Sequence, residues 1–493
     1  MPRGKAIMVQ GTGSHVGKSV LTTAFCRIFR QDGYRVAPFK AQNMSNNAAV
    51  CADGGEIGRA QAEQAAACGV EPTTAMNPIL LKPCSDVGSQ VVVSGRATGT
   101  MTAKEYQPYK LTLLPLVQRA IDSLLENYEV VVIEGAGSPA EINLKQHDIV
   151  NMRTAAMAEA PVLLVGDIDK GGVFAQLLGT FELLDEDERQ RVRALIINKF
   201  RGDREILTPG VQFLEARLGR PVLGVVPYLH DLRIAEEDTL PETSRNGTLA
   251  KAGVRIDVIR HPRISNFTDF DGFGNAVRYV TEPPADLPDA IILPGTKSTV
   301  ADLLQLRQRG FEPWLRRARA ANVEIVGICG GFQMLGNAIL DPERIESSHD
   351  SVEGLGMLDG ATVFQSNKET ARVKAVHAES GLELEAYEIH MGCTQGNPGN
   401  PPLFRITRRH DMPAEGYDGM ASSDGRVWGT YLHGLFDGEP FRRWWLQRLR
   451  PDMFPAAGCA AVPAPPAENR FDVLADAVRK SIDVGSLYRI VWG

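Results

Sequence analysis

The sequence predicts an α/β protein built from two doubly wound, mostly parallel-sheet domains and a helical C-terminal tail. At 493 residues the chain is too long for one ordinary core, so we expect two or three domains. Short runs rich in Val and Ile alternate with segments of helical periodicity in both halves, which is typical of buried parallel strands covered on both faces. The composition shifts across Glu236–Gly253, where Pro, Ser, Asn and Gly indicate a linker.

The first predicted domain covers residues 1–240. Its apolar runs are short and end in Gly, Asp, Glu, Asn or Pro, and Leu113–Leu125 between them has helical periodicity. Functional residues in an open parallel sheet gather beyond the carboxyl ends of the strands, so we expect the site where these runs end. The predicted strands are Ala6–Val9, Val130–Ile133, Val162–Val165, Ala194–Ile197 and Val222–Val226.

The second predicted domain covers residues 254–446 and repeats the alternating pattern. Its predicted strands are Ile256–Ile259, Ala290–Leu293 and Glu324–Ile328. Residues 447–493 are predicted to form a linker and a C-terminal helix. Pro455–Ala467 is a spacer rich in Pro and Ala, and Phe471–Ile490 has helical periodicity.

The composition excludes several classes of protein. The net charge is -7 and no block of Lys and Arg stands out, which argues against nucleic acid as the main ligand. The seven cysteines are scattered, with no pair at CxxC spacing, so neither a zinc site nor a disulfide framework is indicated. Met1–Ala6 runs directly into a predicted strand and no apolar stretch is long enough to span a bilayer. We therefore expect a cytoplasmic protein without a membrane partner.

A glycine-rich segment, Gly11–Ser19, follows the first strand and opens an apolar helix. Glycines let backbone N–H groups turn toward a phosphate, and the helix N-terminus adds the positive end of its dipole. Lys18 could reach the terminal phosphates while the Ser19 hydroxyl ligates Mg²⁺. The alternative is a plain glycine-rich turn between a strand and a helix. The candidate nucleotide contacts here are Gly11, Thr12, Gly13, Val16, Gly17, Lys18 and Ser19.

Five residues separate Gly11 from Gly17, one more than in the usual phosphate loop. This spacing resembles the dethiobiotin synthetase and cobyrinate amidase group of P-loop ligases, which phosphorylate a carboxylate. The resemblance implies ATP and Mg²⁺, with Lys40 as a second phosphate-facing lysine and Asn198 in an adenine-facing loop. It also implies Glu134 and Asp53 as Mg²⁺ partners beside Ser19, although a solvated loop charge is the alternative for each acid.

Val326–Leu335 reads as a strand, a tight turn and a helix, with small residues on both sides of Cys329. Such a nucleophile elbow presents its side chain on a sharp turn, where the helix N-terminus and a nearby base activate the thiol. The backbone N–H of Gly330 would face the developing oxyanion. His433, at the end of a strand-like run, is the better candidate for the base, and His390 is the rival. A buried structural cysteine is the alternative.

This half resembles the class I glutamine amidotransferase domain, which is flavodoxin-like. The resemblance implies that Cys329 attacks the carboxamide of L-glutamine and that a thioester releases ammonia. Gly295 lies in a loop similar to the one that supplies the second oxyanion donor. Most of that class have a glutamate two residues after the histidine, but this chain has Leu435 there. Asp437 is one candidate to orient His433, and a Cys–His dyad is the other.

Further segments, spread over nearly the whole chain, resemble the cobyric acid synthase family. The resemblance implies ATP-dependent amidation of the b, d, e and g carboxylates of adenosylcobyrinic a,c-diamide, a step of cobalamin biosynthesis, with glutamine as nitrogen donor. The segments are Phe39–Asn47, Glu56–Gln61, Met76–Pro83, Ser89–Val93, Asp167–Phe174 and Tyr387–Gly392.

Amide and basic side chains in these segments are candidate contacts for a corrinoid polycarboxylate, although turn formation explains asparagines equally well. Two other functions stay open: a cobyrinic acid a,c-diamide synthase, and a P-loop regulatory ATPase fused to an inactive amidotransferase-like domain. The sequence leaves the oligomeric state open. The candidate contacts are Asn43, Asn46, Asn47, Gln61, Asn77 and Lys82.

Overall fold

The computed structural model describes residues 3–85, 88–229, 253–396, 402–454 and 467–493. The first domain is built on a six-stranded, all-parallel sheet in the order β12-β11-β10-β1-β9-β2. Every strand predicted for this domain is present, because continuous Val and Ile runs are what a strand buried on both faces requires. The strands are β1 (Lys5–Gly11), β2 (Val36–Phe39), β9 (Val130–Glu134), β10 (Val162–Asp167), β11 (Val192–Phe200) and β12 (Val222–Pro227).

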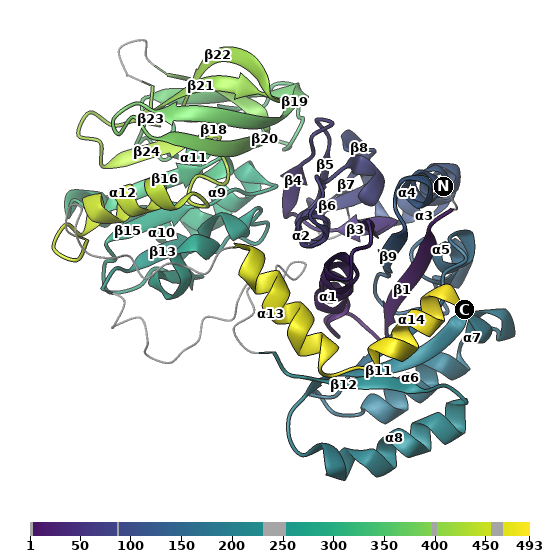
Figure 1. The fold of residues 1–493 in the computed structure, drawn as a ribbon. Helices are drawn as coiled ribbons and strands as arrows, with labels where there is room; N and C mark the ends of the chain where they lie inside the picture. The colour runs from purple at the N-terminus through teal and green to yellow at the C-terminus, as the bar shows by residue number, and fades with distance from the viewer. Residues whose placement is uncertain (1–2, 86–87, 230–252, 397–401, 455–466) are drawn as a thin grey trace.

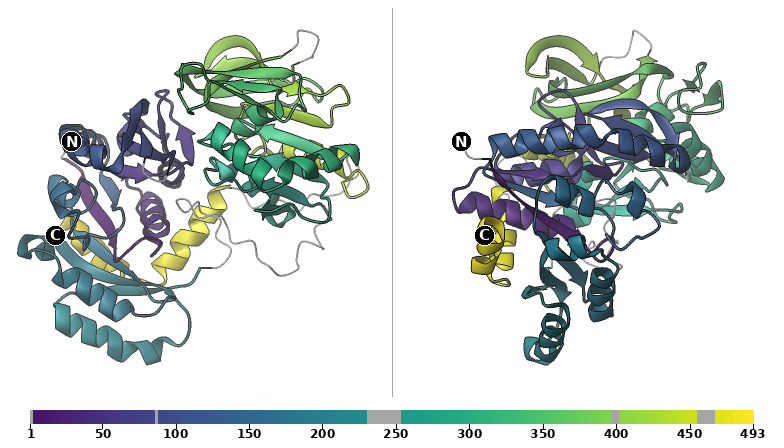
Figure 2. Two further views of the ribbon diagram at one scale, coloured as in Figure 1. Left: turned by 180° about the vertical axis from the view of Figure 1, so that it is seen from behind. Right: turned by 90° about the vertical axis from the view of Figure 1, so that its right-hand side faces the viewer.

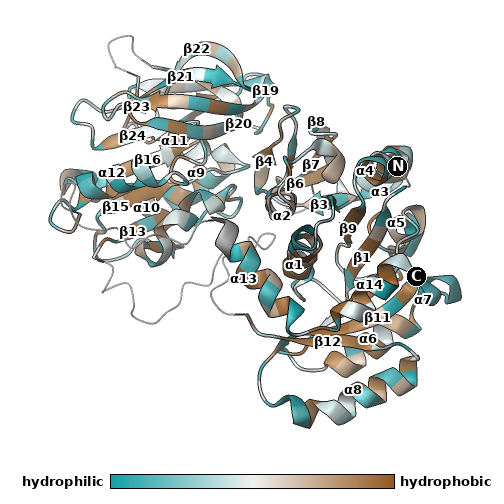
Figure 3. Cartoon of the chain, viewed as in Figure 1, coloured by the Kyte–Doolittle hydropathy of each residue, from teal (hydrophilic) through white to brown (hydrophobic). Residues whose placement is uncertain are grey.

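Helices cover both faces of this sheet, and the strands beneath them are predominantly hydrophobic (Figures 1 and 3). The predicted helix at Leu113–Leu125 is α4, and Leu113 is its N-cap residue. The helices of the domain are α1 (Lys18–Gln31), α2 (Arg59–Cys68), α3 (Ala103–Thr112), α4 (Leu114–Asn127), α5 (Met152–Met157), α6 (Val173–Glu182), α7 (Glu186–Arg191) and α8 (Arg204–Leu218).

Two small sheets that were not predicted lie between β2 and α3 along the chain. Strands β3, β6, β7 and β8 form one sheet, and the hairpin of β4 and β5 forms the other. Residues of β4, β6 and β7 share a small apolar cluster with β20 of the second domain, so these sheets stand between the two domains. The strands are β3 (Gln42–Met44), β4 (Ala48–Val50), β5 (Glu56–Gly58), β6 (Ile79–Pro83), β7 (Gly88–Val93) and β8 (Arg96–Thr102).

The second domain also has a central six-stranded sheet, in the order β14-β13-β15-β16-β24-β23, which is parallel except at β23. This confirms the predicted class of two parallel-sheet domains. The strands are β13 (Ile256–Ile259), β14 (Val277–Val280), β15 (Ala290–Leu293), β16 (Glu324–Ile328), β23 (Met420–Ala421) and β24 (Val427–Thr430). The helices are α9 (Thr299–Gln308), α10 (Phe311–Ala320), α11 (Gly330–Leu335) and α12 (Glu439–Leu449).

A second, mixed sheet covers one side of this domain and was not predicted. Its long strands β19 and β20 pair antiparallel over most of their length, and the sheet lies at the top of the domain in Figure 1. The strands are β17 (Ala338–Leu340), β18 (Ser351–Glu353), β19 (Gly360–His377), β20 (Glu383–Gly396), β21 (Phe404–Arg409) and β22 (Met412–Asp418).

The C-terminal tail forms two helices where one was expected, α13 (Ala467–Arg479) and α14 (Val484–Trp492). Both return to the first domain (Figures 1 and 2). There Phe471 and Leu474 pack in one apolar core with Phe25 of α1, and Arg27 pairs with Asp472 at 2.7 Å. Nearly all of the predicted linker and spacer, residues 236–252 and 455–466, lies outside the described residues.

Candidate active sites

The phosphate loop connects β1 to α1 as predicted. The carboxylate of Glu134, at the end of β9, accepts hydrogen bonds beside this loop. Lys18 Nζ lies 2.8 Å from the carbonyl oxygen of Gly13. The Ser19 hydroxyl donates to Glu134 Oε1 at 2.8 Å, and Lys40 Nζ donates to the same oxygen at 3.0 Å. Burial alone would raise the pKa of Glu134, but the Lys40 charge and its hydrogen bonds hold that pKa below its ordinary value. Glu134 is therefore ionised beside the loop.

Close contacts around the loop explain why its first residue, Gly11, and Gly17 are glycines. Gly17 has a φ of 94°, and a Cβ there would lie 2.1 Å from Asn198 Nδ2. That Nδ2 donates to the carbonyl oxygen of Val16 at 2.8 Å, so Asn198 braces the loop from below. The resemblance implied an adenine-facing loop at Asn198, but the structure directs its amide to the loop backbone. Gly11 likewise lies against Val16, because a Cβ would come within 2.5 Å of the Val16 side chain.

The residues around Glu134 fit Mg²⁺. This ion prefers one or two carboxylates, hydroxyl oxygen and phosphate oxygen, and the Ser19 hydroxyl and Glu134 carboxylate lie side by side at the loop. Asp53 is not brought to them. Its exposed carboxylate accepts hydrogen bonds from the Thr74 hydroxyl at 2.7 Å and from the backbone N–H of Gly55 at 3.3 Å, and it does not line the adjoining pocket.

A pocket of about 680 Å³ opens beside the phosphate loop and is lined by Lys18, Ser19, Lys40 and Glu134. Asn43 lines it as well, while the other five candidate corrinoid contacts have their side chains engaged elsewhere. Gln61 accepts from Asn43, Asn77 holds the backbone of Gly58 and Lys40, and Lys82 pairs with Glu56. Asn46 donates to the Pro83 carbonyl oxygen, and Asn47 accepts from the backbone N–H of Phe267.

Cys329 lies on the sharp turn between β16 and α11, as predicted. It has a φ of 50°, a conformation that non-glycine residues rarely adopt and that is frequent at functional sites. The turn is tightly packed, because a Cβ on Gly330 would come within 2.8 Å of Thr296. The loop that contains Gly295 thus lies directly against the Cys329 turn.

His433 is the histidine that the structure brings to Cys329, and Asp269 holds its other ring nitrogen. His433 is buried, and its Nδ1 lies 2.6 Å from Asp269 Oδ2. Burial lowers the pKa of His433, but the Asp269 carboxylate, and then the hydrogen bond and charge of Cys329, outweigh it and raise that pKa to about 10. The backbone of Tyr387 on β20 exchanges two hydrogen bonds with that of His433. A Cys–His–Asp triad results.

The structure does not support the three alternatives that the sequence left open at this site. Asp437, proposed as the residue that orients His433, instead lies 3.6 Å from Arg59. His390, the rival base, stacks on Tyr431 at 3.9 Å and bonds the Gly392 carbonyl oxygen. Burial lowers the pKa of His390 to about 4, so it is neutral near pH 7. The Cys–His dyad is likewise replaced by the triad.

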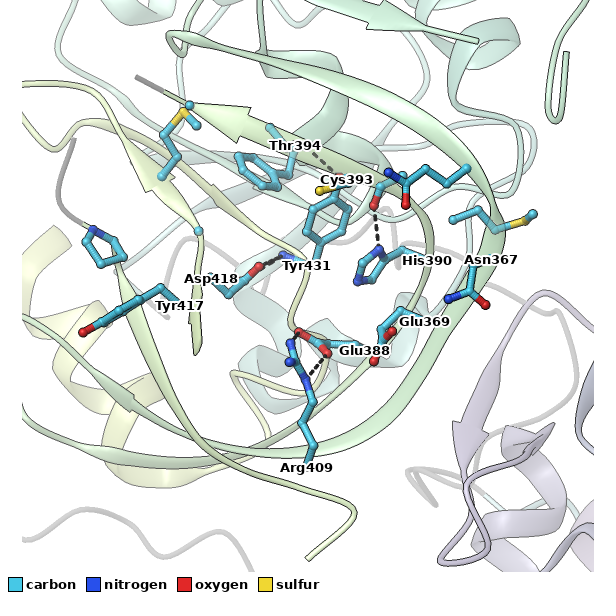
Figure 4. Close-up of a pocket in the computed structure, with 18 residues that line it drawn as sticks. Asn367, Glu369, Glu388, His390, Cys393, Thr394, Arg409, Tyr417, Asp418 and Tyr431 are labelled. Atoms are coloured by element: carbon cyan, nitrogen blue, oxygen red, sulfur yellow. Dashed lines mark hydrogen bonds and ion pairs between the residues drawn. The ribbon is translucent and has the colours of Figure 1, made fainter. Parts of the chain in front are cut away.

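A second pocket, of about 510 Å³, lies in this domain between β20, β21 and the segment before His433. Figure 4 shows Glu388 paired with Arg409, and Asp418 bonded to Tyr431 nearby. The Glu388–Arg409 ion pair measures 3.2 Å. Burial raises the pKa of Asp418 to about 7. The pocket thus presents both a guanidinium and carboxylates close to the segment that leads to His433.

Asp269 was missed because its segment has no recognised motif. It lies in a 3-10 segment, Phe267–Ala276, that follows the predicted strand β13. Its position beyond the carboxyl end of β13 is where functional residues of a parallel sheet gather, but nothing in the sequence distinguishes Asp269 from Asp271.

Comparisons with known proteins agree with this two-site arrangement. Residues 7–241 match the model of the CobQ/CobB/MinD/ParA nucleotide binding domain, and residues 255–441 match that of the CobB/CobQ-like glutamine amidotransferase domain. A cobyric acid synthase from Dehalococcoides mccartyi strain CBDB1 is 47% identical, over 99% of both chains. One from Pelotomaculum thermopropionicum is 50% identical over 90% of this chain and 88% of its own. No helix among the described residues is long and apolar enough to cross a membrane.

Proposed function

The chain belongs to the cobyric acid synthase family, and we propose that its two sites cooperate to amidate the b, d, e and g carboxylates of adenosylcobyrinic a,c-diamide. The observation that carries this proposal is the presence of both half-sites in one molecule. Lys18, Ser19 and Glu134 form a phosphate site in one domain, and Cys329 and His433 form a glutamine-hydrolysing site in the other.

The reaction needs both sites because a carboxylate oxygen is a poor leaving group. At the phosphate loop, a substrate carboxylate oxygen attacks the γ-phosphorus of ATP, which gives an acyl phosphate and ADP. Ammonia then attacks the acyl carbon and inorganic phosphate leaves, which gives the amide. Lys18 and Lys40 offset the phosphate charge, and Mg²⁺ held by Ser19 and Glu134 would supply further charge neutralisation.

At the glutamine site, Nε2 of His433 takes the thiol proton of Cys329, and the thiolate attacks the carboxamide carbon of glutamine. The N–H groups of Gly330 and the Gly295 loop face the oxyanion. When the tetrahedral intermediate collapses, His433 returns the proton to the departing nitrogen and ammonia leaves. Water then hydrolyses the thioester to glutamate and restores Cys329. Asp269 holds the imidazole in the orientation and charge state that these proton transfers need.

The pocket beside the phosphate loop suits a large apolar ring that bears carboxylates. Met44 and Leu144 line it and are 50% and 37% exposed, so they offer apolar surface to such a ring. Lys110 also lines it and is 8% exposed. Burial lowers the pKa of Lys110, although the Asp148 charge opposes this shift. A carboxylate on the ring would pair with that ammonium, and such a local basic group is needed because the net negative charge of the chain does not attract an anion.

Free glutamine is assigned to the pocket lined by Phe332, Arg409, Asp418 and Tyr431. An amino acid carries one carboxylate and one ammonium group, and the pocket offers a guanidinium and several carboxylates. Phe332 lies three residues after Cys329, and Tyr431 two before His433.

Mass spectrometry of the product tests the function directly. The full chain is incubated with ATP, Mg²⁺, glutamine and a corrinoid acid, and the amides gained are counted. Four amides added to the a,c-diamide support the proposal. Two amides added to cobyrinic acid would select the a,c-diamide synthase instead. ATP hydrolysis without any amide would favour the regulatory ATPase and refute both ligases.

A further inference from the structure

Two consecutive residues of β11, Asn198 and Lys199, both hold the backbone of the phosphate loop. Asn198 Nδ2 donates to the carbonyl oxygen of Val16 at 2.8 Å, and Lys199 Nζ donates to that of His15 at 2.6 Å. Successive side chains of a regular strand point to opposite faces of the sheet. The strand is irregular here, because its register with β12 shifts at this point and Lys199 has a φ of 62°. Such irregularities re-aim side chains beside active sites.

The His15 carbonyl group belongs to a strained residue of the loop. A phosphate-binding loop directs N–H groups toward the anion and carbonyl oxygens away from it, and the N–H groups converge where left-handed residues interrupt the backbone. His15 and Gly17 are left-handed, with φ of 59° and 94°, and flank Val16. Glycine adopts this conformation freely, whereas a residue with a Cβ resists it. His15 therefore depends on its surroundings to stay left-handed, and Lys199 holds its carbonyl oxygen.

Lys199 is itself held by a carboxylate at the end of β10. Its Nζ lies 3.4 Å from Asp167 Oδ2, and the side chain of Asp167 is 4% exposed. The other oxygen of Asp167 accepts the backbone N–H of Asp169 at 2.9 Å. A carboxylate fixed at both oxygens keeps the ammonium group in one place. Asp167 begins the segment Asp167–Phe174, so this contact links that segment to the phosphate loop.

Lys199 acts on the loop from outside the pocket. His15 and Lys18 line the pocket beside the phosphate loop, whereas Lys199, also a described residue, does not. Its ammonium group meets the outward-facing carbonyl oxygen of His15 instead. The geometry thus separates Lys18, which can reach the phosphates, from Lys199, which supports the backbone around them.

We propose that Lys199 is a positioning residue for ATP, because its hydrogen bond keeps His15 left-handed and so directs the N–H groups of the loop toward the phosphates. Without this bond His15 relaxes toward a right-handed conformation, and its carbonyl oxygen is free to turn toward the anion. This inference rests on the proposed binding of ATP at Gly11–Ser19.

The test measures binding of a non-hydrolysable imido analogue of ATP, with Mg²⁺, to the full chain by isothermal titration calorimetry. Lys199→Met removes the donor and keeps the apolar stem. We expect Kd to rise about tenfold or more, since a hydrogen bond from a charged group is lost. The matched control is Lys5→Met, which removes a lysine from the exposed, opposite end of the same sheet and should keep Kd within about twofold.

Lys199→Asn separates the lost hydrogen bond from strain at residue 199 itself. Asparagine tolerates a left-handed backbone, but its side chain is too short to reach the His15 carbonyl oxygen. The rise in Kd should therefore equal that of Lys199→Met. This variant also carries the test if Lys199→Met does not fold.

Glycine at residue 15 separates positioning from a direct effect of the lysine charge on the phosphates. In the His15→Gly background, Lys199→Met should raise Kd less than about threefold, because glycine is left-handed without steric cost. A direct electrostatic effect would instead remain about tenfold in both backgrounds.

Hydrogen exchange without nucleotide gives a readout that does not depend on ATP. Backbone amides of residues 12–17, followed by mass spectrometry, should exchange about tenfold faster in Lys199→Met, because the loop opens more often. They should exchange at the wild-type rate in Lys5→Met.

Four results would overturn the inference: an unchanged Kd in either folded Lys199 variant, an equal rise in Lys5→Met, a full rise retained in the His15→Gly background, or unchanged exchange of the loop amides. A wild-type chain that does not bind the analogue would refute the proposed ATP site instead. A chain that binds the analogue equally well without Lys199 would refute this inference alone.

Discussion

Replacing Asp269 by Asn removes the charge that holds His433 in its protonated form. The hydrogen bond between Asp269 Oδ2 and His433 Nδ1 is 2.6 Å long and buried. A hydrogen bond to a charged group contributes about 1.5–3 kcal/mol. That energy corresponds to a factor of between about 10 and 150 in rate if it is lost only when His433 is charged. We therefore expect kcat/KM for glutamine hydrolysis to fall by that factor.

The pH profile of kcat/KM in Asp269→Asn shows in which direction the pKa of His433 changes. Burial lowers the pKa of His433, and the Asp269 carboxylate is the main group that raises it to about 10. Without this carboxylate the imidazolium is less stable and the pKa of His433 falls, so the limb of kcat/KM that follows the protonation of His433 should move to lower pH. The assay is glutamate release across pH 5–9 with ATP and corrinoid present. The matched control is Asp437→Asn, because Asp437 pairs with Arg59 and should change kcat/KM less than about threefold.

Amidation supported by external ammonium should survive Asp269→Asn, since the ligase site does not use His433. Equal losses in Asp269→Asn and Asp437→Asn, or a wild-type profile in Asp269→Asn, would refute the assignment of the triad.

Three further outcomes follow from the structure. Cys329→Ala should abolish glutamine-dependent amidation and leave ammonium-dependent amidation within about twofold when amides are counted by mass; loss of both would contradict the division between two sites. Lys110→Met should raise KM for the corrinoid acid by about tenfold or more, because a charge-assisted contact is lost, and a KM that changes only for ATP would contradict the assignment of Lys110. Glu56→Gln should lower the free energy of unfolding by about 3–5 kcal/mol, since Glu56 is buried between Lys82, at 3.1 Å, and Lys368. Burial raises the pKa of Glu56 but these lysines lower it to about 2, so wild type should lose stability as pH falls from about 4.5 toward 2 and Glu56→Gln should lack this loss in urea titrations.

The parallel sheets could be predicted from the sequence because each buried strand is a continuous apolar run. Val130–Glu134 is buried at all five positions. Its sequence therefore does not alternate between apolar and polar residues, as a strand with one solvent-facing side would. The mixed sheet of the second domain could not be predicted in the same way. β19 has polar residues at many of its 18 positions and is buried mainly at alternate ones near its ends, because one side of this sheet faces solvent.

The phosphate loop and the Cys329 turn could be predicted because the residues of each are contiguous in the sequence. Lys18 and Ser19 lie in the first, and Cys329 and Gly330 lie in the second. The partner of the histidine and the contacts between the domains could not be predicted, because Asp269 lies 164 residues before His433 and Asn47 lies 220 before Phe267. Only the folding of the second domain brings Asp269 to His433, and only the packing of the two domains brings Asn47 to Phe267. The same reason explains why Asn47 and Lys82, whose segments resembled the family, serve contacts within the protein in the structure.

The return of α13 and α14 to the first domain makes the second domain an insertion. The chain leaves the ligase fold after β12, completes the amidotransferase fold, and then supplies Phe471 and Leu474 to the core beside α1. A ligase fragment that stopped after β12 would lack these side chains and would expose the apolar surface of Phe25. The two activities are therefore not separable by cutting the chain once, since a single nick leaves the inserted domain attached at its other end. Independent folds would require excision of the inserted domain, with the α13–α14 segment joined directly to the ligase fold.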